Sequence, residues 1–496
     1  MHASAAGSKL FHNNQRSALL FAAALIAAIK IFEYTLDPDL LLDWDSGDYI
    51  RNGLATGYLS YRSSVYSGLI PLFGLPTHSL SPMVAVQNVM GGLTAFLLAY
   101  ALIKFLAVRP WIGILAGVAF ALDPVQLFHE HYILSETTTV LAMALFLAVA
   151  LQYLSDCRLF TLMEASFMGI VLVSLRFVYL PLVLATAAII PVVAWFPARK
   201  MRLHGKALAA CLLVSLGATC VFHIGYRHLT GWIYDREPAY QYEAGFFLLG
   251  TVSPLIKATD IDDPRVAQAF KQTSERFPRD YLYRNSQLWE PDGLVWTIRR
   301  AYNDDRAANA AAENLARKVI RQHPLDFLKL SWETYCAFWR LYPGLPVLLQ
   351  LDRTASVVGA HDASLISPVF SEYNTHYKNK NSLSRRYLTV AFRWYLFLML
   401  SPYILAVALL AKPANLRGVA LLFVWTCMLQ FATCIGIQIV TTRYMHPFSF
   451  TSLIGAALLC ESLLSGIRKP SLVSTAAAAP VCADKIGTYD KEVTAG

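Results

Sequence analysis

Residues 137–154 read TTTVLAMALFLAVALQYL and contain no charged side chain. A helix needs about 20 mostly apolar residues to cross a bilayer, so this segment is long enough to span one. Similar runs on both sides predict an all-α polytopic membrane protein with ten spans, at about 17–35, 83–106, 110–127, 137–154, 160–175, 178–196, 207–225, 388–411, 417–440 and 446–466. The span at 160–175 is short and contains Glu164, so a re-entrant segment is its alternative.

The composition of the 496 residues agrees with this fold class. Only 15% of them are charged and 56% are hydrophobic, whereas soluble domains carry about 25% charge and disorder needs low hydrophobicity. An ordinary cytosolic enzyme is therefore excluded. The net charge of +9 fits Lys and Arg in short cytoplasmic loops, and no zinc-finger spacing predicts a nucleic-acid partner. The eight cysteines lie mostly in apolar runs, which predicts neither structural disulfides nor a cysteine-ligated metal.

The predicted spans divide the chain into four parts. These are an N-terminal transmembrane module at 1–225 with an acidic first outer loop at 36–82, a mostly helical extracytoplasmic region at 226–387, C-terminal transmembrane helices at 388–466, and a tail at 467–496. Lys and Arg of the short loops are concentrated on the side of the N-terminus, so both termini are expected in the cytoplasm. The tail is rich in Ala and Ser and is expected to be disordered.

Polar residues that are far apart in the sequence fall in the predicted outer loops. They are Asp43, Asp45 and Asp48 in the first loop, His129, His131 and Glu136 in the second, Arg176 in the third, and Arg443 and Tyr444 in the last. Singly, such residues are explained as helix-terminal charges or interface anchors. Their common side favours one site instead. Carboxylates can accept a proton or hold a metal, and arginine suits phosphate, so the set indicates an enzyme that acts on a lipid-linked phosphate.

Four groups of short motifs carry a family resemblance across most of residues 17–466. They are 45–49 (DSGDY) followed by 61–66 (YRSSVY) and 69–71 (LIP), then 134–137 (LSET), 175–176 (LR) with 180–182 (LPL), and 443–444 (RY) with Pro447. Their order resembles that of the GT-C superfamily of membrane glycosyltransferases. The type it resembles uses polyprenyl-phosphate sugars and includes protein O-mannosyltransferases and aminoarabinose transferases. The 226–387 region is not diagnostic of the family.

The resemblance implies the substrates and the place of the reaction. The donor would be a sugar on undecaprenyl phosphate or a similar polyprenyl phosphate, transferred with inversion to an envelope glycan, lipid or protein. The enzyme would lie in a bacterial-type inner membrane with an extracytoplasmic active site. Asp45 would be the general base, with Asp43 and Asp48 as alternatives. The family often has adjacent acids in this loop, whereas Trp44 separates Asp43 from Asp45 here.

The resemblance also implies roles for the other polar residues. Arg443, with Arg176 and Tyr444, would bind the donor phosphate, and Glu136 would orient the acceptor or the base. No cofactor is required by this mechanism. The alternative is a divalent metal, for which the candidate ligands are Asp43, Asp45, His129 and His131.

Two other functions stay open. An O-antigen ligase or polymerase also has many spans and a large outer loop, but its catalytic residues are expected within 226–387. A lipid or solute transporter would place ionisable residues near the middle of the membrane, whereas those within the spans lie mostly near span ends, at Lys30, Glu33, Glu164, Arg393 and Glu461. Tryptophans of the 226–387 region, such as Trp289, are interpreted as packing and interface residues rather than as sugar-stacking ones.

Overall fold

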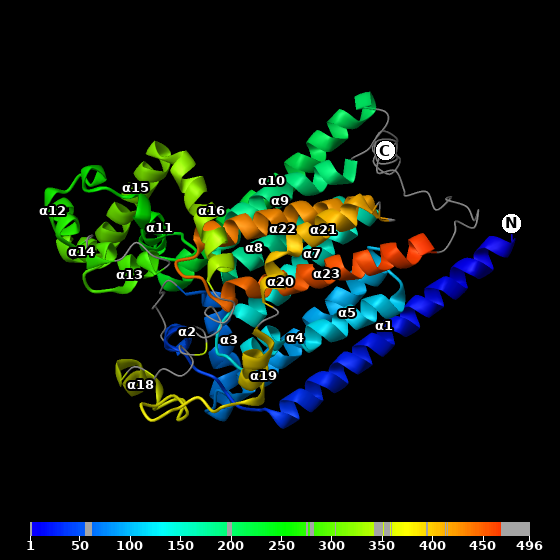
Figure 1. Ribbon diagram of the computed structural model, residues 1–496, viewed down its shortest axis with the longest axis horizontal. Coiled ribbons are helices and arrows are strands. Elements are labelled where there is room, and N and C mark those ends of the chain that lie inside the picture. The colour runs from blue at the N-terminus through cyan, green and yellow to red at the C-terminus, as the bar shows by residue number, and fades with distance from the viewer. Residues whose placement is uncertain are drawn as a thin grey trace.

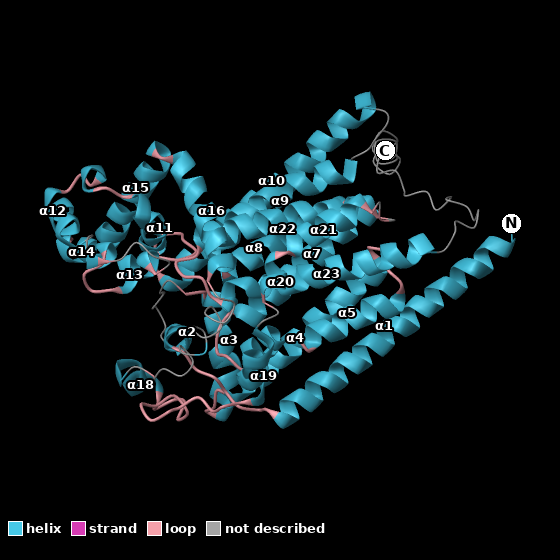
Figure 2. Ribbon diagram, viewed as in Figure 1, coloured by secondary structure: helices cyan, strands magenta, loops and turns pink. Residues whose placement is uncertain are grey.

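The helices account for the regular structure of the described chain. The computed structural model describes residues 2–54, 62–195, 201–273, 276–277, 282–302, 304–341, 351, 358, 360–392, 395–411, 413 and 415–467. Within these ranges no strand is present, and the one extended contact is an isolated parallel bridge between Leu41 and Tyr132 (Figure 2). The predicted helical fold class is confirmed.

Seven of the described helical segments are long and apolar enough to cross a membrane. They lie in α1 (His2–Leu36), α4 (Ser81–Lys104), α7 (Glu136–Asp156), η2 (Phe177–Tyr179) with α9 (Leu180–Trp195), α10 (Met201–Tyr234), α22 (Leu416–Gly436) and α23 (Thr442–Ile467). An eighth is reached if α5 (Pro110–Ala121) and α6 (Pro124–Glu130) count as one span, although they meet at 51°. The predicted number of ten is not confirmed.

The differences from ten spans have local causes. The predicted fifth span is α8 (Leu159–Leu175). It is a single helix of 17 residues and is shorter than the seven candidate spans. The predicted eighth span is divided among α19 (Leu383–Ala391), α20 (Leu396–Met399) and α21 (Ser401–Leu410). Helix α8 continues unbroken past Glu164, and the bend lies in the third predicted span, between α5 and α6. There Pro124 cannot continue the hydrogen bonding of α5, and the Asp123 carboxylate caps α6 by accepting from two backbone N–H groups at 2.8 and 2.9 Å.

A second group of helices forms a compact unit with its own apolar core. We call this unit the cap; it consists of α11 (Ala244–Val252), η3 (Ser253–Leu255), η4 (Ala258–Asp260), α12 (Pro264–Thr273), α13 (Tyr283–Trp289), α14 (Leu294–Ala301) and α15 (Asp305–Gln322). The amphipathic segment predicted at 325–342 is α16 (Pro324–Arg340), which packs on α22. Because α10 continues to Tyr234, the predicted boundary at 226 falls inside a helix.

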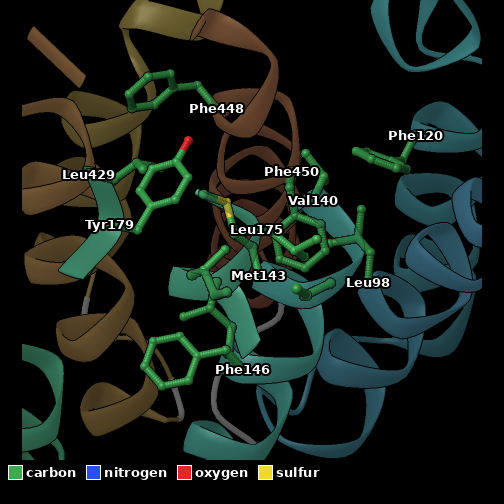
Figure 3. Close-up of a cluster of buried hydrophobic side chains, with 14 of the residues drawn as sticks. Leu98, Phe120, Val140, Met143, Phe146, Leu175, Tyr179, Leu429, Phe448 and Phe450 are labelled. Carbon is green, nitrogen blue, oxygen red and sulfur yellow. The ribbon is translucent and has the colours of Figure 1, made fainter. Parts of the chain in front are cut away.

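The long helices run side by side, and the cap lies at one end of their bundle (Figure 1). The short helices α2 (Trp44–Leu54), α3 (Ser64–Gly74) with η1 (Leu75–Thr77), and α18 (Ala360–Ile366) lie at the same end, whereas the N-terminus lies at the other. The bundle core is filled by large apolar side chains from α4, α5, α7, α8, α22 and α23, such as Phe120, Phe146 and Phe448 (Figure 3).

Two further predictions concern the end of the chain and the cysteines. The tail predicted at 467–496 lies, after Ile467, outside the described residues. Among the described residues, six cysteines are free thiols: Cys211, Cys220, Cys336, Cys427, Cys434 and Cys460.

Candidate functional site

Helix α2 brings the acids of the first loop into a fixed arrangement. Asp43 precedes the helix, where its carboxylate accepts from the Trp44 N–H at 2.6 Å and its backbone N–H donates to the Ser46 hydroxyl at 2.9 Å. These two bonds start the helix in the way of an N-cap. Asp45 and Asp48 are three residues apart within α2 and therefore share one helix face.

On this face Asp45 belongs to a group of five charged side chains, which come from five parts of the chain. Arg443 donates through Nε to Glu136 Oε1 and through Nη1 to Asp45 Oδ2. Arg176 donates to the same oxygen of Glu136, and Arg62 donates to the second oxygen of Asp45. We call these five residues the charge cluster. Its three guanidiniums and two carboxylates are neutralised when Asp48, which Arg62 also contacts at 3.5 Å, is included. The guanidiniums that border the cavity can bind an anion in exchange for one of their carboxylate partners.

The members of the charge cluster stand at helix ends. Glu136 is the first residue of α7 and Arg443 the second of α23. Arg176 has extended backbone (φ −147°, ψ 106°) between α8 and η2. Side chains at such ends lie where the bundle meets the cap, yet the side chains of Glu136 and Arg443 are only 2% and 5% exposed. Charges this buried are stable only when paired, and each of them has its partner here.

The charge cluster borders a cavity of about 820 Å³ between the bundle and the cap. Four of the five cluster residues line it, together with Tyr49 and Tyr444. A second wall is apolar and comes from α9 and α22, with Leu180, Pro181, Leu182, Ala185, Met428, Phe431, Ala432 and Ile435. A third wall comes from the cap, the segment that leads into it and α16, and offers Gln241, Asn285, Trp289, Glu313, Arg317 and Phe327. The cavity therefore has one charged, one apolar and one mixed polar and aromatic side.

The cap is fastened to the turn that leads into α23. The buried Arg284 of α13 donates to the Ile437 carbonyl at 2.9 Å and to the Leu330 carbonyl of α16 at 3.3 Å. Gln438 donates to the Thr251 hydroxyl of α11 at 3.2 Å. Because residues 437–438 lie only five to six residues before Arg443, these bonds hold the third wall of the cavity close to the charge cluster.

Four of the sequence-predicted residues, from all four predicted outer loops, are brought into contact: Asp45, Glu136, Arg176 and Arg443. Tyr444 lines the same cavity. Asp48 does not line the cavity and accepts from Arg51 at 2.5 Å and from Arg62 at 3.5 Å. Asp43 remains at the start of α2 and does not line the cavity.

The two histidines of the second predicted outer loop lie apart from the cavity. His131 Nε2 is 2.6 Å from a carboxylate oxygen of Glu33, and the ring of His129 stacks on that of His446 with centroids 5.0 Å apart. Within the described residues, no group of three or more His, Cys, Asp or Glu side chains could hold a metal ion. The set of metal ligands considered from the sequence is therefore not assembled.

His131 lies outside the cavity, and its ionisation depends on neighbouring carboxylates. Burial alone lowers the pKa of its imidazole, but the hydrogen bond and the charge of Glu33 outweigh burial. The charge of Asp37 and the carbonyl of Asp39 act in the same direction. The pKa of His131 is consequently raised above its ordinary value of 6.5.

Sequence reasoning missed one residue of the site. Arg62 lies inside the 61–66 motif and was given no role, although it pairs with Asp45. A loop arginine beside a cluster of acids was the available indication. Trp289, interpreted as a packing residue, holds its ring 5.8 Å from that of Phe247 and also lines the cavity, where it is 40% exposed.

Comparison of the chain with protein-family models gives no match, and comparison with curated proteins gives none either. The function is therefore inferred from the site.

Proposed function

We propose that the chain is an integral membrane glycosyltransferase of the GT-C type. It moves a sugar from a polyprenyl-phosphate donor to an envelope glycan, lipid or protein on the extracytoplasmic face, with inversion at the sugar. The observation that carries this proposal is the contact of Arg443 with both Asp45 and Glu136, beside a cavity whose next wall is apolar. A lipid-linked phosphate needs that combination of paired cations and apolar surface.

The donor phosphate binds at Arg443 and Arg176. Both guanidiniums border the cavity and both contact Glu136, so they are held at a fixed separation from each other. A guanidinium binds phosphate oxygens in a bidentate way, so the two guanidiniums compensate the charge of the phosphate. The hydrocarbon chain of the donor then follows the apolar wall of α9 and α22 toward the lipid.

The transfer step uses Asp45 as the general base. The oxygen of the acceptor hydroxyl forms a bond to the anomeric carbon from the side opposite the phosphate, and its proton passes to the Asp45 carboxylate. The bond between that carbon and the phosphate oxygen breaks, and its electron pair stays on the phosphate. Arg443 and Arg176 stabilise the negative charge that grows there.

The third wall of the cavity supplies groups that recognise sugars. The indole of Trp289 offers an apolar face to the C–H groups of a sugar ring. The amides of Gln241 and Asn285 and the Glu313–Arg317 ion pair offer hydrogen bonds to hydroxyl groups. The sugar and acceptor therefore lie between this wall and Asp45.

One observation bears on the transporter alternative. Lys30 and Glu130 form an ion pair inside the bundle, with side chains 5% and 0% exposed. Lys30 is six residues from the end of α1 at Leu36, or about 9 Å at 1.5 Å per residue. That depth is closer to the middle than to the edge of a bilayer about 30 Å thick, so this pair is an observation that favours the transporter, which is kept as the second candidate.

The test is transfer of labelled sugar by the purified protein in liposomes, supplied with polyprenyl-phosphate sugars and envelope acceptors. Wild type is compared with Asp45→Asn, Arg443→Ala and the control Asp39→Asn. Asp39 is an acid of the same loop but pairs with the exposed Lys380 at 2.7 Å and does not line the cavity. We expect transfer by wild type and the control and its loss in the two site variants.

Absence of transfer from every donor by folded wild type would contradict the proposal. Label that enters sealed vesicles without transfer would instead favour the transporter. Transfer that survives Asp45→Asn and depends on residues of 226–387 would favour the ligase or polymerase.

A further inference from the structure

Helix α6 is bound to its surroundings by an unusual number of buried polar contacts. The Glu130 carboxylate accepts from Lys30 Nζ at 2.7 and 2.8 Å and from Gln126 Nε2 at 2.7 Å. The backbone carbonyl of Glu130 accepts from the Gln87 amide of α4 at 2.8 Å. A Cβ atom at Gly91 of α4 would come within 1.7 Å of the same carboxylate, so the glycine leaves the space in which Glu130 lies.

The same short helix holds one face of α23. Gln126 Oε1 is 2.8 Å from His446 Nε2, and Asp123 Oδ2 accepts from the Ser449 hydroxyl at 2.5 Å. His446 and Ser449 follow Arg443 at intervals of three residues, so the three side chains lie on one face of the helix. Contacts at the two later positions therefore fix the rotation of α23 and with it the direction of Arg443.

Helix α6 also fixes the position of the chain segment that leads to Glu136. Five residues separate the end of α6 from Glu136, and they are held by bonds to α2 and to the segment before it. The Leu41 N–H donates to the His131 carbonyl at 2.8 Å, the Ile133 N–H donates to the Leu41 carbonyl at 3.1 Å, and the Ser135 hydroxyl lies 2.8 Å from that of Tyr49. A displacement of α6 is consequently passed on to Glu136.

We propose that α6 and the Lys30–Glu130 pair act as a clamp that sets the position of Glu136 relative to Arg443. Lys30, Gln126 and His446 are thus positioning residues of the charge cluster, although none of them lines the cavity. The direction of the hydrogen bonds supports this role. The amide of Gln126 donates to Glu130, so its oxygen faces His446 and accepts from Nε2. Lys30 donates to the same carboxylate from the other side, so the bonds from α1 and from α23 converge on Glu130.

The clamp is tested first without any assay of sugar transfer, so that its failure is separate from failure of the proposed function. Phenylglyoxal modifies accessible arginines, and peptide mass spectrometry gives the rate at each one. In wild type the paired and buried Arg443 is modified slowly, whereas Arg317, 58% exposed, is modified rapidly. In Lys30→Met and in His446→Phe we expect the rate at Arg443 to rise toward that of Arg317. The pair-restoring double variant, Lys30→Glu with Glu130→Lys, returns it toward the wild-type rate.

The matched control is Arg109→Met. Arg109 forms an ion pair with Glu461 at 3.3 Å between α5 and α23, eighteen residues beyond Arg443, or about 27 Å along the helix. Loss of this pair leaves Arg443 protected if the clamp is specific. Where wild type transfers sugar, the clamp variants also lose kcat/KM by on the order of 10²-fold, as expected for a displacement of about 1 Å, and this loss lies in kcat more than in KM.

Unchanged protection of Arg443 in folded Lys30→Met and His446→Phe overturns the proposal, and so does equal deprotection in Arg109→Met. Should Lys30→Met not fold because it strands Glu130, His446→Phe decides the question, since it removes one hydrogen bond and no buried charge.

Discussion

The most decisive perturbation of the site is Arg443→Lys. Arginine reaches Asp45 through one nitrogen and Glu136 through another. Lysine presents a single ammonium on a flexible stem and cannot reproduce this fork. The substitution therefore keeps the positive charge but cannot bind both carboxylates through separate nitrogens. It tests whether Asp45 and Glu136 must be held by one side chain.

The structure sets the size of the two expected effects. Stranding a buried charge costs about 3–5 kcal/mol, but here Asp45 keeps Arg62 and Glu136 keeps Arg176. The loss of folding stability should thus be closer to that of one charged hydrogen bond, about 1.5–3 kcal/mol. Loss of a preorganised donor to the growing phosphate charge costs about 10²–10³-fold in kcat. Activity should therefore fall far more than the folded fraction does.

The assay combines transfer of labelled sugar in liposomes with thermal unfolding in detergent, and the control is Arg306→Lys, which lies outside the cavity. Arg306 pairs with Glu237 at 3.2 Å and both side chains are exposed, so this control should change kcat by less than threefold, in line with the small contribution of surface pairs. A folded Arg443→Lys protein with near wild-type kcat would refute the assigned role of the fork.

Three further predictions follow from the same geometry. Asp45→Asn should bind polyprenyl phosphate more tightly than wild type, because the carboxylate no longer competes for Arg443, and yet transfer sugar about 10²–10⁴-fold more slowly. Native mass spectrometry measures the binding and single turnover measures the transfer, and equal losses in both would contradict this prediction. Trp289→Ala should raise the KM for the sugar substrate about tenfold with little change in kcat, at about 1.4 kcal/mol for one aromatic contact; a steady-state titration decides it. The raised pKa of His131 stabilises the fold fully below pH 6.5, and this contribution is lost as the pH rises through the folded-state pKa. Thermal midpoints should therefore fall over that range in wild type and fall less in His131→Gln.

Much of the fold could be predicted because lipid imposes a simple rule on sequence. Apolar runs such as 137–154 must be helices, since no other open structure satisfies the backbone there, and α7 has nearly the predicted bounds. The break at Asp123 could not be read in the same way. The segment that contains α5 and α6 is apolar enough for one span. The chain bends there because Pro124 cannot continue α5 and the Asp123 side chain N-caps α6.

The residues of the site could be predicted from the sequence better than the contacts between them. Asp45, Glu136, Arg176 and Arg443 stand out because charged residues beside apolar runs are rare and costly. Their pairing was not predictable, since it depends on how α2, α7 and α23 pack, and the same is true of Lys30 and Glu130, which lie 100 residues apart. The cap wall with Trp289 depends on tertiary contacts such as that of Arg284 with the Ile437 carbonyl.

The pairing of Asp45 constrains the order of events in the proposed reaction. Asp45 is bound by two guanidiniums, Arg62 and Arg443. A carboxylate between two positive charges is a weak base. In the proposed mechanism, a donor phosphate that binds Arg443 competes directly with Asp45 for that guanidinium, leaves Asp45 with Arg62 alone and so makes it a stronger base. Activation of an acceptor hydroxyl is thereby tied to binding of the sugar phosphate.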